Sequence, residues 1–211
     1  MDARIDWLFD GPETGAPLFA LAHGAGAPMD SPSLNALAAG LGAAGMRVAR
    51  FEFPYMAARR TGGKKGAPDR EPVLLDTWRA AVAELREGHR GKLIVGGKSM
   101  GGRMASRIAD EVGADGLVCL GYPFHPPGRP EKLRTAHLET LRTPTLIVQG
   151  TRDPFGTPED VAGYSLSPAI RVVWLEDGDH SFVPRKSSGR TEKQNVAEAV
   201  DAVAAFVRSL G

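Results

Sequence analysis

A serine, an aspartate and a histidine in this chain are of the types that together activate a hydroxyl group for nucleophilic attack. Ser99 lies in residues 97–101, Gly-Lys-Ser-Met-Gly, between an apolar run and a helix-forming run. This G-x-S-x-G pattern is typical of a sharp strand-to-helix turn that raises a serine hydroxyl above the end of a sheet. Asp153 and His180 each follow another predicted strand. Because an imidazole can take the serine proton and a carboxylate can orient the imidazole, Ser99, Asp153 and His180 are the predicted catalytic residues.

The same stretch partly matches a phosphate-binding loop, since Gly97-Lys98-Ser99 could end the pattern G-x-x-x-x-G-K-S. That pattern requires a glycine five positions before Gly97, where the chain has Lys92. The residues directly before Gly97 are Leu-Ile-Val-Gly, which is typical of a strand end rather than of a loop that surrounds an anion. The sequence therefore favours the serine turn over the phosphate-binding loop.

Other histidines could in principle serve as the base. His125 follows a strand that ends at the same edge as the serine turn, and it is expected to form a wall of the pocket rather than to act as the base. His89 and His137 lie in polar segments and are expected to be exposed to solvent. His180 is therefore the preferred base.

Two other carboxylates lie close to the predicted base in the sequence. Asp179 adjoins His180, and adjacent residues rarely reach the geometry that a carboxylate needs to orient an imidazole. Asp177 remains a minor alternative. Asp153 is therefore the preferred acid.

The sequence His23-Gly24-Ala25-Gly26 ends an earlier short strand. A simple glycine-rich turn is one interpretation. The other is a loop whose backbone N–H acts with that of the residue after the nucleophile to bind the oxyanion of a tetrahedral intermediate. In the second interpretation the donors are Ala25 and Met100.

Short apolar runs alternate with helix-forming stretches along the chain. The expected strands are residues 4–9, 18–22, 46–53, 93–95, 116–122, 145–149 and 171–176. The expected helices are residues 32–44, 71–87, 103–112, 158–164 and 192–210, with a weak helical stretch at 132–140. This alternation predicts an α/β fold, with a mostly parallel sheet covered by helices on both faces, in a single domain over residues 1–211. Only residues 123–144 separate two of the strands at the place where a lid could be inserted, so no large lid is expected.

Aromatic and histidine side chains in the loops near the predicted site could line an apolar pocket for an acyl or alcohol group. Packing within the loops is the alternative for each of them. The candidate substrate-binding residues are Tyr55, Tyr122, Phe124, His125, Phe155 and Phe182.

A basic, glycine-containing stretch at residues 59–70 is most simply a solvated loop. It could also attract a carboxylate or a phosphate of the substrate. Its basic residues are Arg59, Arg60, Lys64, Lys65 and Arg70.

Composition limits the remaining classes of function. The formal net charge of +1 over 211 residues gives no reason to expect a nucleic acid or an acidic partner. The only cysteine, Cys119, lies in an apolar run and is expected to be buried and inert, and no cysteine or histidine cluster suggests a metal or another cofactor. No apolar run is long enough to span a membrane and the N-terminus has no apolar signal core, so a cytoplasmic protein acting on a small molecule is expected. The oligomeric state is left open.

Taken as a set, the motifs resemble those of the small α/β-hydrolases related to dienelactone hydrolase. More narrowly, they resemble the group that includes testis-expressed hydrolase-like proteins and the hydrolase-like subunit of a histone acetyltransferase complex. The motifs are residues 23–26, 50–55, 97–103, 150–156 and 178–182. The resemblance implies an α/β-hydrolase fold and a serine hydrolase that cleaves a carboxylic ester or thioester through an acyl-enzyme. Because the group also contains members used for assembly, a non-catalytic binding or scaffold module is the alternative.

Overall fold

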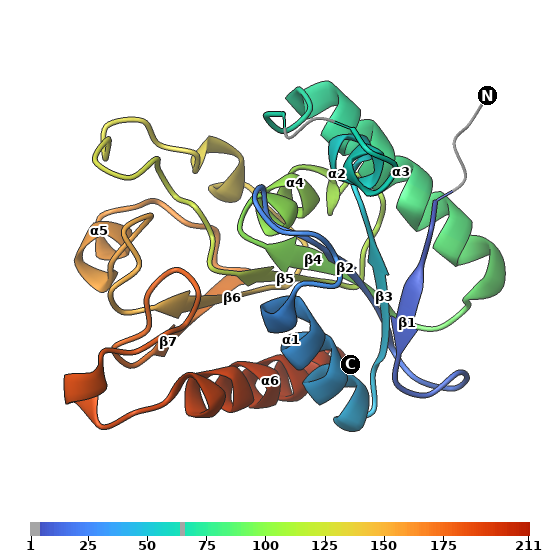
Figure 1. The fold of residues 1–211 in the computed structure, drawn as a ribbon. Coiled ribbons are helices and arrows are strands. Elements are labelled where there is room, and N and C mark those ends of the chain that lie inside the picture. Colours follow the sequence, from blue (N-terminus) through green and yellow to red (C-terminus); the bar gives the residue numbers. More distant parts are fainter. Residues whose placement is uncertain (1–4, 64–65) are drawn as a thin grey trace.

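A twisted seven-stranded sheet runs through the middle of the computed structural model, which describes residues 5–63 and 66–211 (Figure 1). The strands follow the order β1-β3-β2-β4-β5-β6-β7 across the sheet. Every neighbouring pair is parallel except β1 and β3, which are antiparallel. The mostly parallel sheet is therefore confirmed. The strands are β1 (Leu8–Asp10), β2 (Leu18–Ala22), β3 (Arg47–Phe51), β4 (Leu93–Lys98), β5 (Gly116–Leu120), β6 (Thr145–Gly150) and β7 (Ile170–Leu175).

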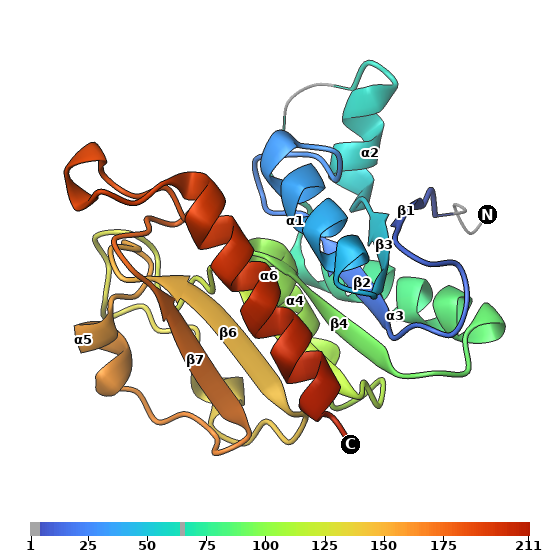
Figure 2. The ribbon, with the colours of Figure 1, turned by 90° about the horizontal axis from the view of Figure 1, so that it is seen from below.

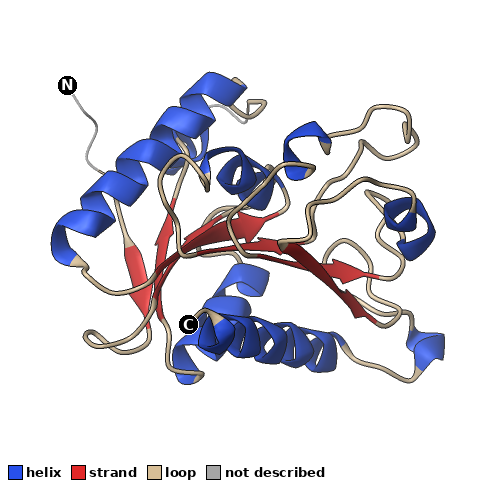
Figure 3. Cartoon of the chain, turned by 180° about the vertical axis from the view of Figure 1, so that it is seen from behind, coloured by secondary structure: helices blue, strands red, loops and turns tan. Residues whose placement is uncertain are grey.

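Helices cover both faces of this sheet (Figure 3). On one face lie α2 (Pro54–Arg60), α3 (Glu71–Gly88) and α4 (Met100–Ile108). On the other face α1 (Pro32–Ala43) and α6 (Glu192–Ser209) lie side by side across the strands (Figure 2). The short helix α5 (Pro158–Ala162) lies beyond the β7 edge, and single 3-10 turns occur at Ala136–Leu138 and Lys186–Ser188. Because parallel strands need crossover connections, the helices between them form these two covering layers.

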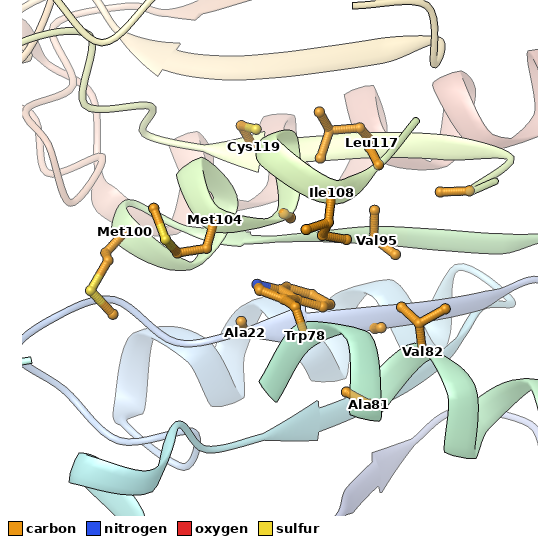
Figure 4. Close-up of a cluster of buried hydrophobic side chains, with 14 of the residues drawn as sticks. Ala22, Trp78, Ala81, Val82, Val95, Met100, Met104, Ile108, Leu117 and Cys119 are labelled. Carbon is orange, nitrogen blue, oxygen red and sulfur yellow. The ribbon is translucent and has the colours of Figure 1, made fainter. Parts of the chain in front are cut away.

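The central strands supply side chains alternately to two hydrophobic cores. In β4, Leu93 and Val95 pack toward α3 and α4, whereas Ile94 packs toward α1 and α6. In the first core the fully buried Trp78 of α3 lies between its helix and the sheet (Figure 4). Its indole Nε1 donates a hydrogen bond to the Gly101 carbonyl oxygen at 3.3 Å. The core therefore fixes α3 directly against the first turn of α4.

The end of β2 and the start of α4 approach each other so closely that only glycine fits between them. A Cβ atom on Gly101 would lie 2.5 Å from the carbonyl oxygen of His23, and one on Gly97 would lie 2.5 Å from that of Ala22. Between these glycines, Ser99 has φ 51° and ψ −116°. A positive φ is rare and strained for a residue with a side chain, so the surrounding packing must hold the turn. The G-x-S-x-G spacing follows from these two contacts.

Cys119 lies in the same core, fully buried. Its S–H donates to the Gly102 carbonyl oxygen at 3.5 Å, and burial raises the pKa of the thiol. Its predicted burial is therefore confirmed.

In the part of the chain that the structure describes, no helix is both long enough and apolar enough to cross a membrane.

Several element boundaries differ from those that the sequence predicts. The helix expected at residues 103–112 is Met100–Ile108, because the chain turns at Ser99 and becomes helical at once. The weak helical stretch at 132–140 is reduced to the 3-10 turn Ala136–Leu138, and the edge strand expected at 4–9 is Leu8–Asp10.

The basic stretch also differs from the loop that was expected. Arg59 and Arg60 lie in the last turn of α2, which begins at Pro54, a residue that is preorganised for the first turn of a helix. Arg60 is bound by the carboxylates of Glu52 and Asp30. The structure therefore places these two arginines on a helix. Lys64, Lys65 and the beginning of the predicted edge strand at Arg4 lie outside the described residues.

The close approach of β2 and α4 beside the Ser99 turn predicts the effect of replacing Gly101 on the stability of the fold. Gly101→Ala should lower the free energy of unfolding by about 1–3 kcal/mol, because the new methyl group meets backbone atoms that cannot move aside. Gly88→Ala is the matched control, since a Cβ atom there meets nothing within 4 Å. The measurement is urea denaturation of both variants beside the unchanged protein. A Gly101→Ala protein as stable as Gly88→Ala would contradict the packing described here.

Candidate active site

The three side chains that the sequence predicts to act together are joined by hydrogen bonds at the carboxyl ends of β4, β6 and β7. The Nε2 atom of His180 lies 2.8 Å from the Ser99 hydroxyl oxygen, and its Nδ1 atom lies 2.8 Å from Oδ2 of Asp153. The Asp153 side chain is completely buried, whereas the imidazole and the serine are partly exposed. A serine hydroxyl that faces solvent is thus connected to a carboxylate in the interior.

The surroundings of Asp153 assign the proton positions in this chain. Its Oδ1 accepts the backbone N–H of Phe155 at 2.9 Å, and its Oδ2 also accepts from the side-chain amide of Gln149 at 2.9 Å. Both oxygens of Asp153 therefore act as hydrogen-bond acceptors in these contacts. Nδ1 of His180 is then the donor to Asp153, which leaves Nε2 as the acceptor for the Ser99 hydroxyl proton. This is the tautomer that a general base requires.

Gln149 is a supporting residue that sequence reasoning missed. Its side chain is fully buried at the end of β6, and its Oε1 accepts the backbone N–H of Tyr122 at 2.7 Å. The same side chain therefore links the end of β5 to the carboxylate of Asp153. A polar residue in the otherwise apolar end of a predicted strand, four positions before the predicted acid, was the available signal.

The two alternative carboxylates have other partners. Asp177 is bound by Arg185 and Arg152, and the hydrogen bond from Arg185 lowers the pKa of Asp177 to about 2. Oδ1 of Asp179 accepts backbone N–H groups of Ser181 and Val183 at 2.7 and 3.0 Å. These contacts stabilise the loop that carries His180, and the carboxylate hydrogen-bonded to its imidazole is Asp153.

The glycine-rich loop after β2 is held in place by two side chains. The Nε2 atom of His23 accepts the backbone N–H of Phe53 at 3.1 Å, so Nδ1 carries the proton and donates to the Gly24 carbonyl oxygen at 2.6 Å. Burial lowers the pKa of His23, which favours this neutral form. The Tyr55 hydroxyl donates to the Ala25 carbonyl oxygen at 2.9 Å. His23 was missed as a positioning residue in the sequence, although it adjoins the predicted loop.

The two predicted oxyanion donors lie beside the nucleophile. Ala25 and Met100 line a cleft together with Ser99. Met100 is the first residue of α4, where backbone N–H groups have no partner within the helix. Within residues 5–63 and 66–211, neither amide donates to a backbone acceptor. Within these residues, both amides thus lack a backbone partner beside Ser99.

Ser99 lies where two clefts meet. One has a volume of about 330 Å³ and is bordered by Lys98, His180 and the glycine-rich loop. The other has a volume of about 370 Å³ and is bordered by Met100, Arg103 and Arg134. Phe155 lines both clefts, and its ring centroid lies 4.3 Å from that of His180. Two separate spaces are thus available for the two parts of a substrate.

Only one of the six candidate pocket residues, Phe155, lines these clefts. Tyr122, Phe124 and Phe182 are instead fully buried, Tyr122 and Phe124 in the core under α3 and α4 and Phe182 in the core under α1 and α6. His125 is also buried, with Nδ1 2.9 Å from the Pro126 carbonyl oxygen. The structure therefore corrects the expectation that these four side chains line the pocket.

Tyr55 is half-buried and contacts the glycine-rich loop through its hydroxyl group, as described above. It does not border either cleft. Its position indicates support of the loop rather than direct contact with a substrate.

A second serine–histidine pair lies outside the clefts at Ser99. The Ser106 hydroxyl donates to the Arg103 carbonyl oxygen at 2.7 Å, so the His137 Nε2 atom, 2.8 Å away, must donate to Ser106. Ser106 is buried, and burial lowers the pKa of His137 to about 4. This pair has neither the access nor the proton arrangement of a nucleophile and its base. His137, like His89, is partly buried rather than exposed as expected.

Lys98 is a further residue at the site, which the sequence presented only as part of the rejected phosphate loop. Its ammonium donates to the backbone carbonyl oxygen of His180 at 2.5 Å and lies 5.5 Å from the ring centroid of Phe182. Burial lowers the pKa of Lys98 to about 8, although the carboxylate of Asp153 acts in the opposite direction. Lys98 therefore connects the end of β4 to the loop that carries the imidazole.

Across residues 5–63 and 66–211, no three His, Cys, Asp or Glu side chains gather closely enough to hold a metal ion.

Comparison with known proteins places this architecture in a family. The sequence profile of the alpha/beta hydrolase domain matches residues 15–208, and the chain belongs to that family. A serine hydrolase without a lid from Xanthomonas campestris is 22% identical, with a TM-score of 0.72 over 97% of this chain and 88% of the other. An alpha-beta serine hydrolase homologue from Coxiella burnetii is 18% identical, with a TM-score of 0.70 over 98% and 92%. Est1E from Butyrivibrio proteoclasticus is 15% identical, with a TM-score of 0.71 over 97% and 95%. The α/β-hydrolase fold is therefore confirmed, as is its likeness to members without a lid.

The ion pairs of Asp177 predict a pH-dependent stability. Asp177→Asn should lower the free energy of unfolding at neutral pH, because Arg185 and Arg152 lose their ionised partner. Asparagine tolerates the positive φ of 54° at this position, so the backbone can remain unchanged. Since the pKa in the folded protein is about 2 and lies below that of the unfolded chain, the stabilisation is present above about pH 4 and is lost as the pH falls toward 2.

The measurement is urea denaturation at several pH values between about 2 and 7. Asp201→Asn is the matched control, because this exposed residue of α6 has no ion pair within the described part of the chain. A stability difference between Asp177→Asn and the unchanged protein that persists undiminished at the lowest pH would exclude the ion pairs as its cause.

Proposed function

We propose that this protein is a serine hydrolase that cleaves a carboxylic ester or a thioester through an acyl-enzyme. The observation that carries the proposal is the hydrogen-bonded series of Ser99, His180 and Asp153 at the meeting point of two clefts. A buried carboxylate, a correctly oriented imidazole and an accessible hydroxyl are the groups that this chemistry requires. The strained backbone of Ser99 supports the same conclusion, since such strain concentrates at functional sites.

In the proposed reaction, the Ser99 oxygen attacks the carbonyl carbon while its proton moves to Nε2 of His180. Asp153 stabilises the resulting imidazolium, and the amides of Ala25 and Met100 bind the oxyanion. When the tetrahedral intermediate collapses, the bond to the leaving oxygen or sulfur breaks and that atom takes the proton from Nε2. A water molecule then attacks the acyl-enzyme by the same sequence of proton transfers, which releases the acid and restores the Ser99 hydroxyl group.

The alternative is a binding or scaffold module that keeps the fold without turnover. The hydrogen-bonded series favours the enzyme, because a scaffold has no need of a strained serine whose hydroxyl is joined to a buried carboxylate. The motifs that resemble the dienelactone-hydrolase-related group support a hydrolase as well, and we propose membership of that subgroup. The solved structures described above include Est1E, which has also been solved with ferulic acid bound. Since a carboxylic acid is the product of ester hydrolysis, a small ester of a carboxylic acid is the substrate class that we propose for this chain.

The nucleophile can be identified with a fluorophosphonate probe. The unchanged protein should be labelled at Ser99, and Ser99→Ala should lose both labelling and hydrolysis of short-chain esters. Ser106→Ala is the matched control, because it removes the serine of the second serine–histidine pair and should retain labelling. Peptide mass spectrometry locates the label. Labelling that survives Ser99→Ala would reject the assignment, and an unlabelled, inactive but folded protein would favour the scaffold.

The acid can be identified by comparing carboxylates. Asp153→Asn should lower kcat by a factor on the order of 10³–10⁴ with the fold retained, because the imidazole loses the partner that fixes its tautomer. Asp179→Asn should affect kcat much less, since its carboxylate accepts backbone N–H groups of its own turn and is not hydrogen-bonded to the imidazole of His180. Steady-state kinetics on one soluble ester, with circular dichroism to monitor folding, makes the comparison. If Asp179→Asn were the more damaging change in a folded protein, the proposed acid would be wrong.

A further inference from the structure

Cationic side chains gather along one of the two clefts that meet at Ser99. Arg103 of α4 and Arg134 of the loop between β5 and β6 both line this cleft. A smaller neighbouring hollow is also lined by Arg103 and Arg134, and Arg107, one helical turn after Arg103, lines it as well. Three guanidinium groups therefore lie on one side of the nucleophile, and we call them the arginine cluster.

The carboxylates of the same cleft are already engaged. Oε2 of Glu71 lies 3.2 Å from Nη1 of Arg103, and its Oε1 lies 3.6 Å from Nη2 of Arg107. The Asp69 carboxylate accepts the backbone N–H of Tyr55 at 2.8 Å in the first turn of α2, where a helix favours negative charge. Glu71 is thus the counter-ion of two of the three arginines, and Asp69 is hydrogen-bonded to the backbone of α2.

Arg134 is the member of the cluster that lacks such a partner. In the part of the chain that the structure describes, its guanidinium forms no ion pair or hydrogen bond with a carboxylate. Burial lowers the pKa of Arg134, and the neighbouring Arg103 lowers it further, yet an arginine remains protonated. Its charge is therefore uncompensated at the edge of the cleft.

The backbone of Arg134 is nevertheless firmly placed. Its N–H donates to the Phe124 carbonyl oxygen at 2.8 Å, and its carbonyl oxygen accepts the hydroxyl of the buried Tyr122 at 2.9 Å. The buried Tyr122 thus fixes the backbone from which the half-buried Arg134 side chain extends. Such support is what a binding group needs, because it reduces the entropy lost when a ligand is bound.

The proton path determines which part of a substrate occupies this cleft. In the proposed reaction His180 delivers its proton to the leaving group, and the imidazole borders the other cleft, beside Lys98. The leaving group therefore occupies the cleft of His180. The acyl group must then extend the opposite way, past Met100 toward the arginine cluster.

We infer that the preferred substrates carry an anionic group, a carboxylate or a phosphate, on the acyl side of the scissile bond, with Arg134 as its main partner. A planar guanidinium matches the two oxygens of either group. This inference rests on the proposed hydrolase function and specifies its substrate class. The uncompensated cation in the acyl cleft, with its fixed backbone, is the observation that carries it.

The test compares kcat/KM for anionic and neutral acyl groups of matched length. Monoethyl glutarate and ethyl 4-phosphonobutyrate are set against ethyl valerate, with the product acid followed by titration. The expected ratio of anionic to neutral ester is about 10 or more, as one charge-assisted hydrogen-bonded pair supplies, and it should fall with ionic strength. The two anionic esters distinguish a carboxylate from a phosphonate, which stands in for a phosphate group. A charge on the leaving group, tested with 4-acetoxybenzoate against phenyl acetate, should give no such preference.

Two variants should move this ratio in opposite directions. Arg134→Gln should lower it by about 10-fold or more, because the charge-assisted contact is lost. Glu71→Gln should raise it, because Arg103 and Arg107 lose their counter-charge. Arg129→Gln, an exposed arginine of the same loop, is the matched control and should leave the ratio unchanged.

The outcomes separate this inference from the function on which it rests. A ratio near one that Arg134→Gln does not change would overturn the inference, while labelling of Ser99 by the fluorophosphonate would leave the hydrolase standing. If no ester is cleaved, calorimetry of glutarate binding to the Ser99→Ala protein tests the anion site directly. Binding that weakens in the double variant with Arg134→Gln supports the anion site, and the absence of binding rejects it.

Discussion

The contact between the end of β2 and the first turn of α4 is the constraint on which the rest of the site depends. Gly97 and Gly101 allow this contact, since a Cβ atom on either would lie within 2.5 Å of a backbone oxygen. Because the chain must turn from strand to helix in so little space, Ser99 is forced to a positive φ. Its hydroxyl is thereby placed above the sheet, beside the backbone amides of the first turn of α4.

Around this turn, the parallel sheet brings together segments that are far apart in the sequence. Ser99, Asp153 and His180 follow β4, β6 and β7, and all three strands end at the same edge. The packing of the sheet fixes the distances among them before any substrate arrives. In the reaction proposed for this chain, preorganisation of this kind is the main contribution to lowering the activation barrier.

The loops at that edge are stabilised by polar contacts that would be costly if they were left unpaired. Gln149 joins two strand ends to the Asp153 carboxylate, and His23 joins the glycine-rich loop to the end of β3. Lys98 joins the nucleophile's strand to the His180 backbone. These residues position Ser99, Asp153 and His180, the groups that react in the proposed mechanism, so variants at them should affect geometry more than chemistry.

The sequence by itself determined the order of strands and helices and marked the candidate reactive groups. Alternating apolar runs indicated the parallel sheet and its helices, and the glycine spacing marked Ser99, because both patterns express local geometry that neighbouring residues impose. Only the tertiary structure decided which loop side chains face the site. Phe155 borders the clefts while Tyr122 and Phe182 are buried. Among the residues that the structure describes, Arg134 has no carboxylate partner while Arg60 is paired with Glu52. These outcomes depend on contacts between residues that are distant along the chain, and no local periodicity encodes the direction in which a loop side chain points.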